Sequence, residues 1–254
     1  MNKNTPSVTA FNAPHIGGAV TQVTEGGCIE GGCVEACLST TYFGSVSWYA
    51  QLARATSPVY IEAHENYVKQ TARTRCRIAT ANGVQTLSVP VNATPADGGG
   101  KCPIREVRIT DHANWRHQHW NALKSAYGES PFFDYYADDI APFFEKKWEF
   151  LFDFNLEIIH KMCELLDIHP DIRLTEAFQG ARVAKRGDSA RVVREGDLAR
   201  VAREEGSARA DGSLMECTEL KPYYQVFQKR HGFIEDLSVL DLLFNMGNEA
   251  VLYL

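Results

Sequence analysis

The chain lacks any run of about 18 consecutive apolar residues, so its sequence predicts no membrane-spanning helix. It also lacks a surplus of basic residues, because 26 Lys and Arg stand against 32 Asp and Glu, for a net charge of -6. Binding to nucleic acid or to acidic membranes needs a basic face, so neither partner is expected. The N-terminus has no charged region followed by an apolar one, which argues against a signal peptide and favours the cytoplasm.

No glycine-rich phosphate loop of the Rossmann or Walker type is present, and the GGGK stretch at residues 98–101 is too short to form one. A nucleotide would therefore be held by side chains, and no cofactor is expected. The seven cysteines are an odd number at irregular spacings, which favours free thiols in a reducing compartment. Cys28, Cys33 and Cys37 match no standard zinc spacing, so no metal site is expected either.

Length and composition predict a soluble globular protein, with 44% apolar and 23% charged residues in a chain of 254. Residues 1–35 are rich in Gly, Thr, Asn and Val without a helical period, and we interpret them as a flexible extension. A nine-residue repeat (ARVAKRGDS, ARVVREGDL, ARVAREEGS) occupies about residues 180–215 and has few large apolar side chains. We interpret it as a low-complexity insertion that interrupts a single domain of residues 36–254.

The first half of this domain has the residue patterns of strands. The Asn82-Gly83 pair predicts a hairpin turn between two of them, because both residues tolerate positive φ. One helix is expected at residues 43–55, where apolar side chains recur at helical spacing. About five strands are expected: CLST, VYIEAH, the two runs that flank Asn82-Gly83, and IREVRIT at residues 104–110.

The second half of the domain has helical patterns. A helix from Asn114 would carry Trp115, His119 and Leu123 on one apolar stripe. A short helix, a break before Pro142 and a long amphipathic helix follow, and a last short helix is expected within residues 233–244. The predicted fold class is therefore mixed α/β: a sheet of about five strands in the N-terminal half, packed against helices from the C-terminal half.

Five ordered blocks of the sequence resemble the WbqC-like protein family of bacteria. They are LSTTYFGSVSWYAQL, VYIEAHENYVKQTARTRCRIATANGVQTLSVPV, IREVRITDHANWRHQHWNALKSAYGESPFFDYY, FEKKWEFLFDFNLE and the tail YYQVF…HGFIEDLSVLDLLFNMG. The resemblance covers about residues 36–170 and 220–254, and EAHENY stands where more distant members have an Asp-Asp-x-x-Gln segment. The family is associated with O-antigen and other polysaccharide gene clusters, so the resemblance implies a role in surface-polysaccharide biosynthesis.

Acidic and imidazole side chains follow the second expected strand, where α/β sheets often place a binding crevice. On an extended chain Glu62 and His64 point to the same face. A carboxylate beside an imidazole raises its basicity and sets its tautomer, as a general base requires. Glu62 and His64 are therefore candidate catalytic residues. His119 is a third, with a place in the apolar core as the alternative.

A row of arginines comes next. Arg73, Arg75 and Arg77 would share one face of a strand, and guanidinium groups bind phosphate or carboxylate through paired contacts. We interpret Arg73 and Arg77 as the solvated edge of the hairpin. Arg75 corresponds to an arginine in the family pattern, which implies an anion clamp. The candidate substrate-binding residues are Arg75, Glu65, Trp115 and Tyr127.

Two functional hypotheses follow. In the first, the protein is an enzyme that modifies a small-molecule sugar or a nucleotide-linked sugar, by transfer of an acyl or aminoacyl group. In the second, it is a noncatalytic binding or assembly factor for polysaccharide synthesis. The first hypothesis gains support if His64, His119 and Arg75 meet around one cavity, whereas separate, packed side chains would favour the second.

Overall fold

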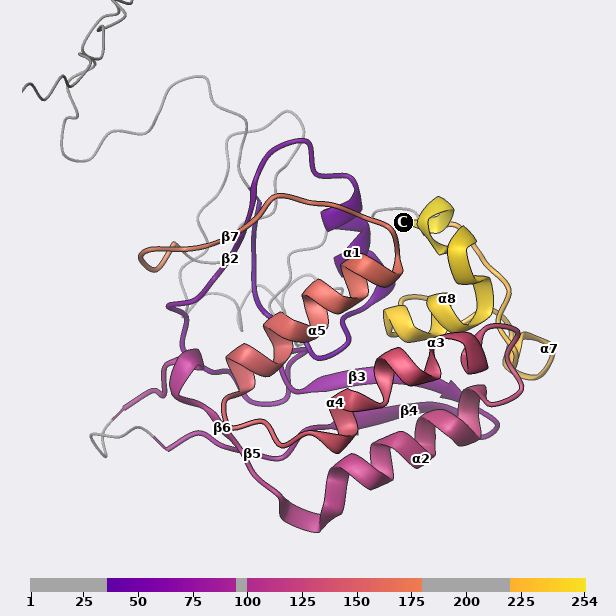
Figure 1. Cartoon of the computed structure of the whole chain (residues 1–254), viewed down its shortest axis with the longest axis horizontal. Coiled ribbons are helices and arrows are strands. Elements are labelled where there is room, and N and C mark those ends of the chain that lie inside the picture. Colours follow the sequence, from indigo (N-terminus) through magenta and orange to yellow (C-terminus); the bar gives the residue numbers. More distant parts are fainter. Residues whose placement is uncertain (1–35, 95–99, 180–219) are drawn as a thin grey trace, which may run out of the picture. The chain divides into compact units, whose positions relative to one another are not determined.

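The structure is a computed structural model that describes residues 36–94, 100–179 and 220–254 (Figure 1). The expected extension at residues 1–35 and the nonapeptide repeat lie outside the described residues. All the described residues belong to one structural unit of mixed α/β type. None of their helices is long and apolar enough to cross a lipid bilayer.

The strands of the described residues form three small sheets, so the single sheet of about five strands is a wrong prediction. The first sheet is parallel in the order β1-β2-β7, the second is the antiparallel pair β3-β4, and the third is the antiparallel pair β5-β6. The strands are β1 (Cys37–Leu38), β2 (Val59–Ile61), β3 (Arg75–Thr80), β4 (Gly83–Ser88), β5 (Val91–Asn92), β6 (Arg108–Ile109) and β7 (Ile172–Leu174).

The expected strand at residues 104–110 is mostly absent. Ile104–Glu106 forms the 3₁₀ helix η1, and only Arg108–Ile109 pairs as a strand. The physical reason lies in the spacing of the apolar residues. Ile104 and Val107 are both fully buried, and a separation of three residues brings two side chains to the same side of a 3₁₀ turn.

The hairpin of β3 and β4 forms where the Asn-Gly pair predicts it, with a shifted turn. Thr80 pairs with Gly83, so Ala81 and Asn82 are the two turn residues. Of the expected Asn82-Gly83 pair only Gly83 has a positive φ, at 107°. This arrangement matches a turn closed by a glycine bulge, in which only the closing residue needs the glycine conformation.

The helical half agrees with the expected pattern except in two places, one of which is the short helix at Gln228–His231, which was not expected. The expected long helix after Pro142 is divided, because Lys146 and Phe150 have extended backbones. The last expected helix is confirmed, with Ser238 as its N-cap and Gly247 at its end. The helices are α1 (Val46–Ala53), α2 (Trp115–Tyr127), α3 (Phe133–Ile140), α4 (Pro142–Glu145), α5 (Leu151–Leu165), α7 (Gln228–His231) and α8 (Val239–Met246), with short 3₁₀ turns η2 (His112–Asn114) and η3 (Gly247–Tyr253).

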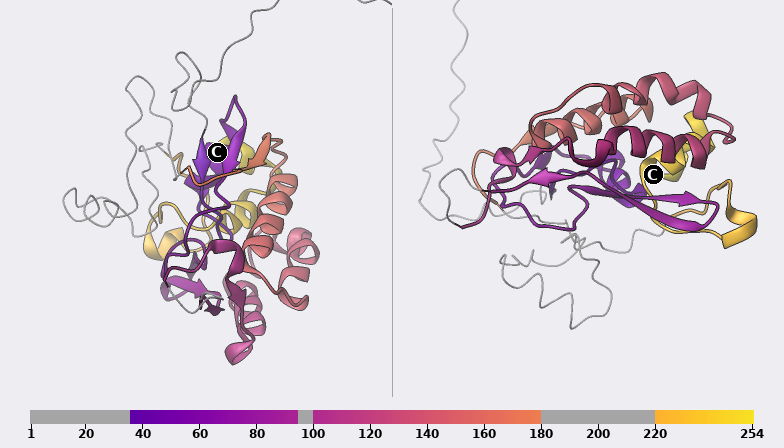
Figure 2. Two further views of the ribbon diagram at one scale, coloured as in Figure 1. Left: turned by 90° about the vertical axis from the view of Figure 1, so that its left-hand side faces the viewer. Right: turned by 90° about the horizontal axis from the view of Figure 1, so that it is seen from below.

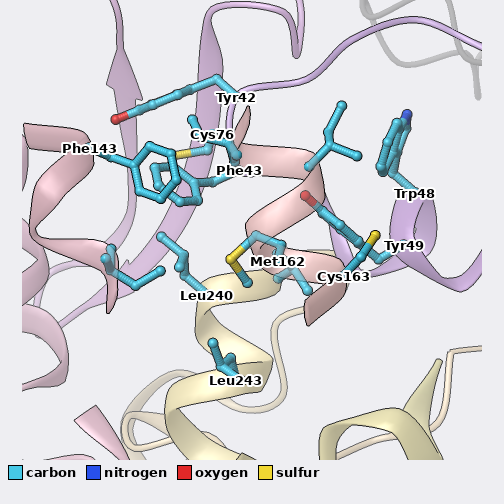
Figure 3. Packing of buried hydrophobic residues seen from close by; sticks show 14 of the residues in the cluster. Tyr42, Phe43, Trp48, Tyr49, Cys76, Phe143, Met162, Cys163, Leu240 and Leu243 are labelled. Carbon is cyan, nitrogen blue, oxygen red and sulfur yellow. The ribbon is translucent and has the colours of Figure 1, made fainter. Parts of the chain in front are cut away.

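Helices α2 to α5 lie on one side of the strands (Figure 2), and α2 packs on β3. Figure 3 shows the aromatic and aliphatic side chains that fill the space beneath them, among them Phe43 and Phe143. The C-terminal segment enters this core, since Leu240 and Phe244 of α8 are fully buried. Several backbone hydrogen bonds join it to the rest of the domain: Val46 N donates to the Leu237 carbonyl (3.0 Å), Ser238 N to the Arg77 carbonyl (2.8 Å) and Val239 N to the Gly44 carbonyl (2.8 Å).

Candidate functional site

A cavity of about 350 Å³ lies between β3 and the segment that precedes α8. This volume is near the lower end of the range for small-molecule sites, which is about 300–1,000 Å³. Its charged lining consists of Arg75, Arg77 and Asp236. Its remaining polar lining consists of Ser45, Gln70, Thr71, Thr86 and Ser238, and the rest comes from Phe43, Ala72 and Cys76.

The alternation of β3 explains why two arginines reach the cavity. Side chains of a strand point to opposite faces in turn, so Arg75 and Arg77 share one face while Cys76 and Ile78 share the other, although Cys76, which lies between the two arginines, is also part of the cavity lining. Cys76 and Ile78 are buried, and Figure 3 shows Cys76 among the core aromatics. Arg75 and Arg77 are half-buried, which places two permanent positive charges side by side at the cavity wall. Arg77 is therefore not the solvated residue expected from the sequence.

The opposite charge comes from the segment before α8. Asp236 is 6% exposed and has a positive φ of 53°. Its Oδ1 accepts a hydrogen bond of 3.0 Å from the backbone amide of Ser47 in the first turn of α1. Ser238 beside it caps α8 and donates from its hydroxyl to the Phe43 carbonyl at 2.7 Å. The helix starts of α1 and α8 thus hold this wall of the cavity in place.

Arg73 was expected on a solvated edge, and this prediction is wrong. The strand begins only at Arg75, and the turn before it places Arg73 inside, at 7% exposure. Arg73 Nε donates to Glu65 Oε1 at 2.7 Å, Arg73 Nη2 makes a second contact with Glu65 Oε2, and Arg73 Nη1 donates to the Thr71 hydroxyl at 3.2 Å. Glu65 also accepts from the Ser39 hydroxyl at 2.8 Å. This buried pair therefore supports the turn whose residue Thr71 lines the cavity.

Glu62 and His64 lie at the end of the parallel sheet. Strand β2 ends at Ile61, so the alternation that would place the two side chains on one face does not continue. The buried Glu62 carboxylate accepts from the backbone amide of His64 (2.9 Å), the hydroxyl of Thr175 (2.8 Å) and the backbone amide of Gln179 (2.8 Å). The His64 side chain is exposed. Glu62 thus accepts a hydrogen bond from the backbone of His64. The predicted contact between Glu62 and the His64 imidazole is wrong.

His119 lies within the aromatic core on α2. It is 7% exposed, its Nδ1 lies 2.9 Å from the Tyr42 hydroxyl, and its ring meets that of Trp115 at a centroid distance of 5.1 Å. Burial lowers the pKa of His119 from 6.5 to about 4, and a backbone hydrogen bond with Ser88 partly opposes this shift. The imidazole is therefore neutral near pH 7. Trp115 is also buried, and its Nε1 donates to the Thr110 carbonyl at 2.9 Å.

Tyr127 belongs to a third buried cluster. Its hydroxyl donates to Asp241 Oδ1 at 2.9 Å and accepts from the backbone amide of Ala79 at 3.1 Å. The Tyr223 hydroxyl donates to the other Asp241 oxygen at 2.7 Å. Burial raises the pKa of Asp241 from 3.8 to about 6, against the hydrogen bonds from both tyrosines. The sequence indicates this cluster in one way: Asp241 is an acidic residue within the otherwise apolar stretch SVLDLLF.

The seven candidate residues thus do not converge on one site, although Trp115 and His119 are in contact. Of them, Arg75 lines the cavity, while the others lie at the sheet edge or in the buried clusters just described. Sequence reasoning missed Asp236 as a site residue because nothing local marks it as a neighbour of β3. Among the described residues, no group of three or more His, Cys, Asp or Glu side chains is placed to hold a metal ion.

Comparison with known sequences agrees with the resemblance noted above. The profile of the WbqC-like protein family matches residues 41–253, and the chain belongs to this family. The chain is 30% identical over 198 residues to the uncharacterized protein Rv1507c of Mycobacterium tuberculosis, an alignment that covers 74% of this chain and 83% of the relative. No solved structure matches. The family match includes every residue that lines the cavity.

Proposed function

We propose that the cavity binds a sugar phosphate, either free or as part of a nucleotide-linked sugar. The observation that carries this proposal is the pair of arginines on one face of β3, opposite the polar wall of the α8 segment. Guanidinium groups bind phosphate oxygens through paired, charge-assisted hydrogen bonds. The cavity volume suits a monosaccharide phosphate, so the nucleotide of a larger ligand would extend out of it.

The protein acts on this ligand as an enzyme of O-antigen or other surface-polysaccharide biosynthesis in the cytoplasm. The reaction class is acyl or aminoacyl transfer from an activated donor such as a thioester. A sugar hydroxyl or amine attacks the acyl carbon, the carbon–sulfur bond breaks, the thiolate leaves with its electron pair, and the attacking group gives its proton to a base. Asp236 is the carboxylate of the cavity lining and can accept this proton.

A noncatalytic role is the second candidate, and one observation favours it. Neither His64 nor His119, the two expected general bases, lines the cavity. In this alternative the protein binds the sugar phosphate and presents it to the enzymes that assemble the polysaccharide. The arginine pair would then serve binding alone.

Calorimetric titration with a hexose 1-phosphate and a nucleotide-linked hexose tests the binding site. Arg75→Ala and Arg77→Ala should each weaken binding about tenfold or more, because each removes hydrogen bonds to a charged group. Arg173→Ala is the matched control, since Arg173 is an arginine of β7 that does not line the cavity. Its exposed side chain forms an ion pair with Asp171, which precedes the strand. Binding that is equally tight in all three variants would reject the site.

Deletion of the gene, followed by chemical analysis of the surface glycan, separates the two roles. An enzyme predicts a glycan that lacks one substituent, while an assembly factor predicts loss or shortening of the whole polymer. Complementation with the Arg75→Ala variant should fail in either case, because both roles use the same cavity. Complementation with Arg173→Ala should restore the glycan.

A further inference from the structure

We infer that the backbone amides of the turn at residues 70–72 are a second phosphate-binding element of the cavity, beside the arginines of β3. Gln70, Thr71 and Ala72 all line the cavity, as do both arginines. This inference rests on the proposed function and names the ligand class more closely: a phosphate monoester, whose phosphate group has three free acceptor oxygens.

The amides of this turn are available to a ligand. Within the part of the chain that the structure describes, the amides of Gln70, Thr71 and Ala72 donate no hydrogen bond to another residue. Thr71 is only 3% exposed. Backbone amides of buried residues are nearly always paired, so an unpaired amide in a cavity lining points to a ligand that accepts hydrogen bonds.

The carbonyls of the same turn bind groups of the protein interior. The Thr71 carbonyl accepts from the amide of Thr74 (3.1 Å), and the Ala72 carbonyl accepts from the amide of Tyr42 (2.9 Å) and the hydroxyl of Thr41 (3.3 Å). The described residues contain no cis peptide bond, so the C=O and N–H of one peptide unit point in opposite directions. The Ala72 amide is therefore directed away from Thr74, and Ala72 itself lines the cavity.

The turn is held in place before any ligand binds. Gln70 has a positive φ of 64°, and a left-handed residue within a turn lets successive amides converge on one anion. Arg73, which follows the three residues, is fixed by its buried ion pair with Glu65 and by the hydrogen bond from Asn155 Nδ2 to its carbonyl (2.8 Å). An anion at these amides would thus bind without the cost of ordering the turn.

Donors from two parts of the lining favour a terminal phosphate. The arginines provide charged donors from β3, and the turn provides neutral amide donors. A phosphate monoester has enough free oxygens for both groups of donors, whereas each phosphate of a nucleotide-linked sugar has fewer. A hexose 1-phosphate should therefore bind more tightly than a nucleotide-linked hexose.

Ala72→Pro removes one of the amides, because proline has no backbone N–H. The hydrogen bond from Thr74 to Thr71 makes Ala72 the second residue of a four-residue turn, a position where proline is favoured. In calorimetric titrations, binding of inorganic phosphate and of a hexose 1-phosphate should weaken about tenfold or more. The melting temperature should stay unchanged or rise, because proline restricts the unfolded chain.

Ala81→Pro is the matched control. Ala81 is exposed and is the first of the two turn residues between Thr80 and Gly83, so it has the same place in its own turn. It does not line the cavity, and the variant should bind both probes as tightly as the unaltered protein. Arg75→Ala should weaken the binding of both probes.

Nuclear magnetic resonance of the unaltered protein makes the test independent of how a variant folds. In isotope-labelled protein titrated with inorganic phosphate, the amide proton signals of Gln70, Thr71 and Ala72 should move downfield, because a hydrogen bond to an anion deshields the proton. The amide signal of Ala81 should stay in place. If Ala72→Pro has a lowered melting temperature, these signals decide the question.

Two results would overturn the inference about the turn. One is phosphate binding to the unaltered protein that leaves the three amide signals in place, and the other is a stable Ala72→Pro variant with unchanged affinity. Tighter binding of the nucleotide-linked hexose than of the hexose 1-phosphate would overturn the ligand class. If the unaltered protein binds none of the probes, including inorganic phosphate, the proposed function itself fails.

Discussion

Two buried residues carry titratable groups with opposite pKa shifts. Burial lowers the pKa of His119 to about 4 and raises the pKa of Asp241 to about 6. The cause is the same in both residues, because loss of water disfavours the charged form whatever its sign. His119 contacts Tyr42 and Trp115, and Asp241 contacts two tyrosine hydroxyls, so neither has an opposite charge as its neighbour among these contacts.

The two shifts predict opposite effects of acid on stability. Unfolded His119 takes up a proton near pH 6.5, whereas folded His119 does so only near pH 4, so acidification through this window destabilises the fold. Folded Asp241 takes up a proton near pH 6, whereas the unfolded side chain does so near pH 3.8, so acidification through this window stabilises the fold. Each effect is at most on the order of 3 kcal/mol, and the two partly cancel.

Urea unfolding at a series of pH values between about 7 and 4 measures these effects. Relative to the unaltered protein, His119→Gln should become more stable as the pH falls through its window. Asp241→Asn should lose stability faster over the same range. Other titrating groups are common to all three proteins and cancel in the comparison. Identical pH slopes in both variants and the unaltered protein would show that neither residue is shifted.

At the scale of elements, local sequence signals located most helices and misjudged several strands. Residues 46–53, 115–127 and 239–246 are helical as predicted, because each has apolar side chains at helical spacing. The strands β1, β5 and β6 have two residues each, too short for alternation to define. Their pairing partners come from elsewhere in the chain, so their ends depend on tertiary contacts.

The β3-β4 turn supports a prediction at this scale. Gly83 has a φ of 107°, whereas Asn82 is not among the residues with positive φ. Gly83→Ala should lower the free energy of unfolding by about 1–2 kcal/mol, because a Cβ is unfavourable in that conformation. No atom lies within 4 Å of the added Cβ, so the cost would come from the backbone alone.

Asn82→Ala is the matched control and should change stability by no more than about 0.5 kcal/mol. Urea unfolding of the two variants makes the comparison. A larger loss in Asn82→Ala than in Gly83→Ala would mean that the turn has the form expected from the sequence, with both residues at positive φ. The comparison thus separates the two descriptions of the hairpin.

For the molecule as a whole, the segment after residue 219 is part of the core. Phe244 is fully buried, and its ring meets those of Tyr127 and Phe133 at centroid distances of 5.3 and 5.0 Å. The segment also contributes Asp236 to the cavity and Asp241 to the buried tyrosine cluster. The first and last described segments must therefore pack together before either the core or the candidate site is complete.

Phe244→Ala tests this role of the C-terminal segment. The substitution should destabilise the fold by about 3–5 kcal/mol, because it removes a buried ring and leaves a cavity. Leu252→Ala in the same segment is the control, since Leu252 is 64% exposed, and its cost should stay within about 0.5 kcal/mol. Thermal and urea unfolding measure the stability of both variants. An equal loss of stability in Phe244→Ala and Leu252→Ala would mean that the segment does not pack as described.

The candidate site divides into a part that the sequence could indicate and a part that it could not. Arg75 and Arg77 share a face because strand alternation is a local property, readable from neighbouring residues. The burial of Arg73 depends on where the strand starts, and the exposure of His64 depends on where β2 ends. Those ends are set by pairing with distant segments, which is why the expected Glu62–imidazole contact is replaced by a contact with the backbone.

Residue order alone establishes the family, the mixed α/β class, most helices and the place of the hairpin, because periodicity, caps and turn residues act over a few positions. Packing establishes the rest: three small sheets in place of one, a neutral His119 inside the core, and a cavity that Asp236, from the far end of the chain, lines together with two arginines. Contacts between distant residues depend on which apolar faces pack together. A short sequence pattern does not identify the distant segment that packs against it.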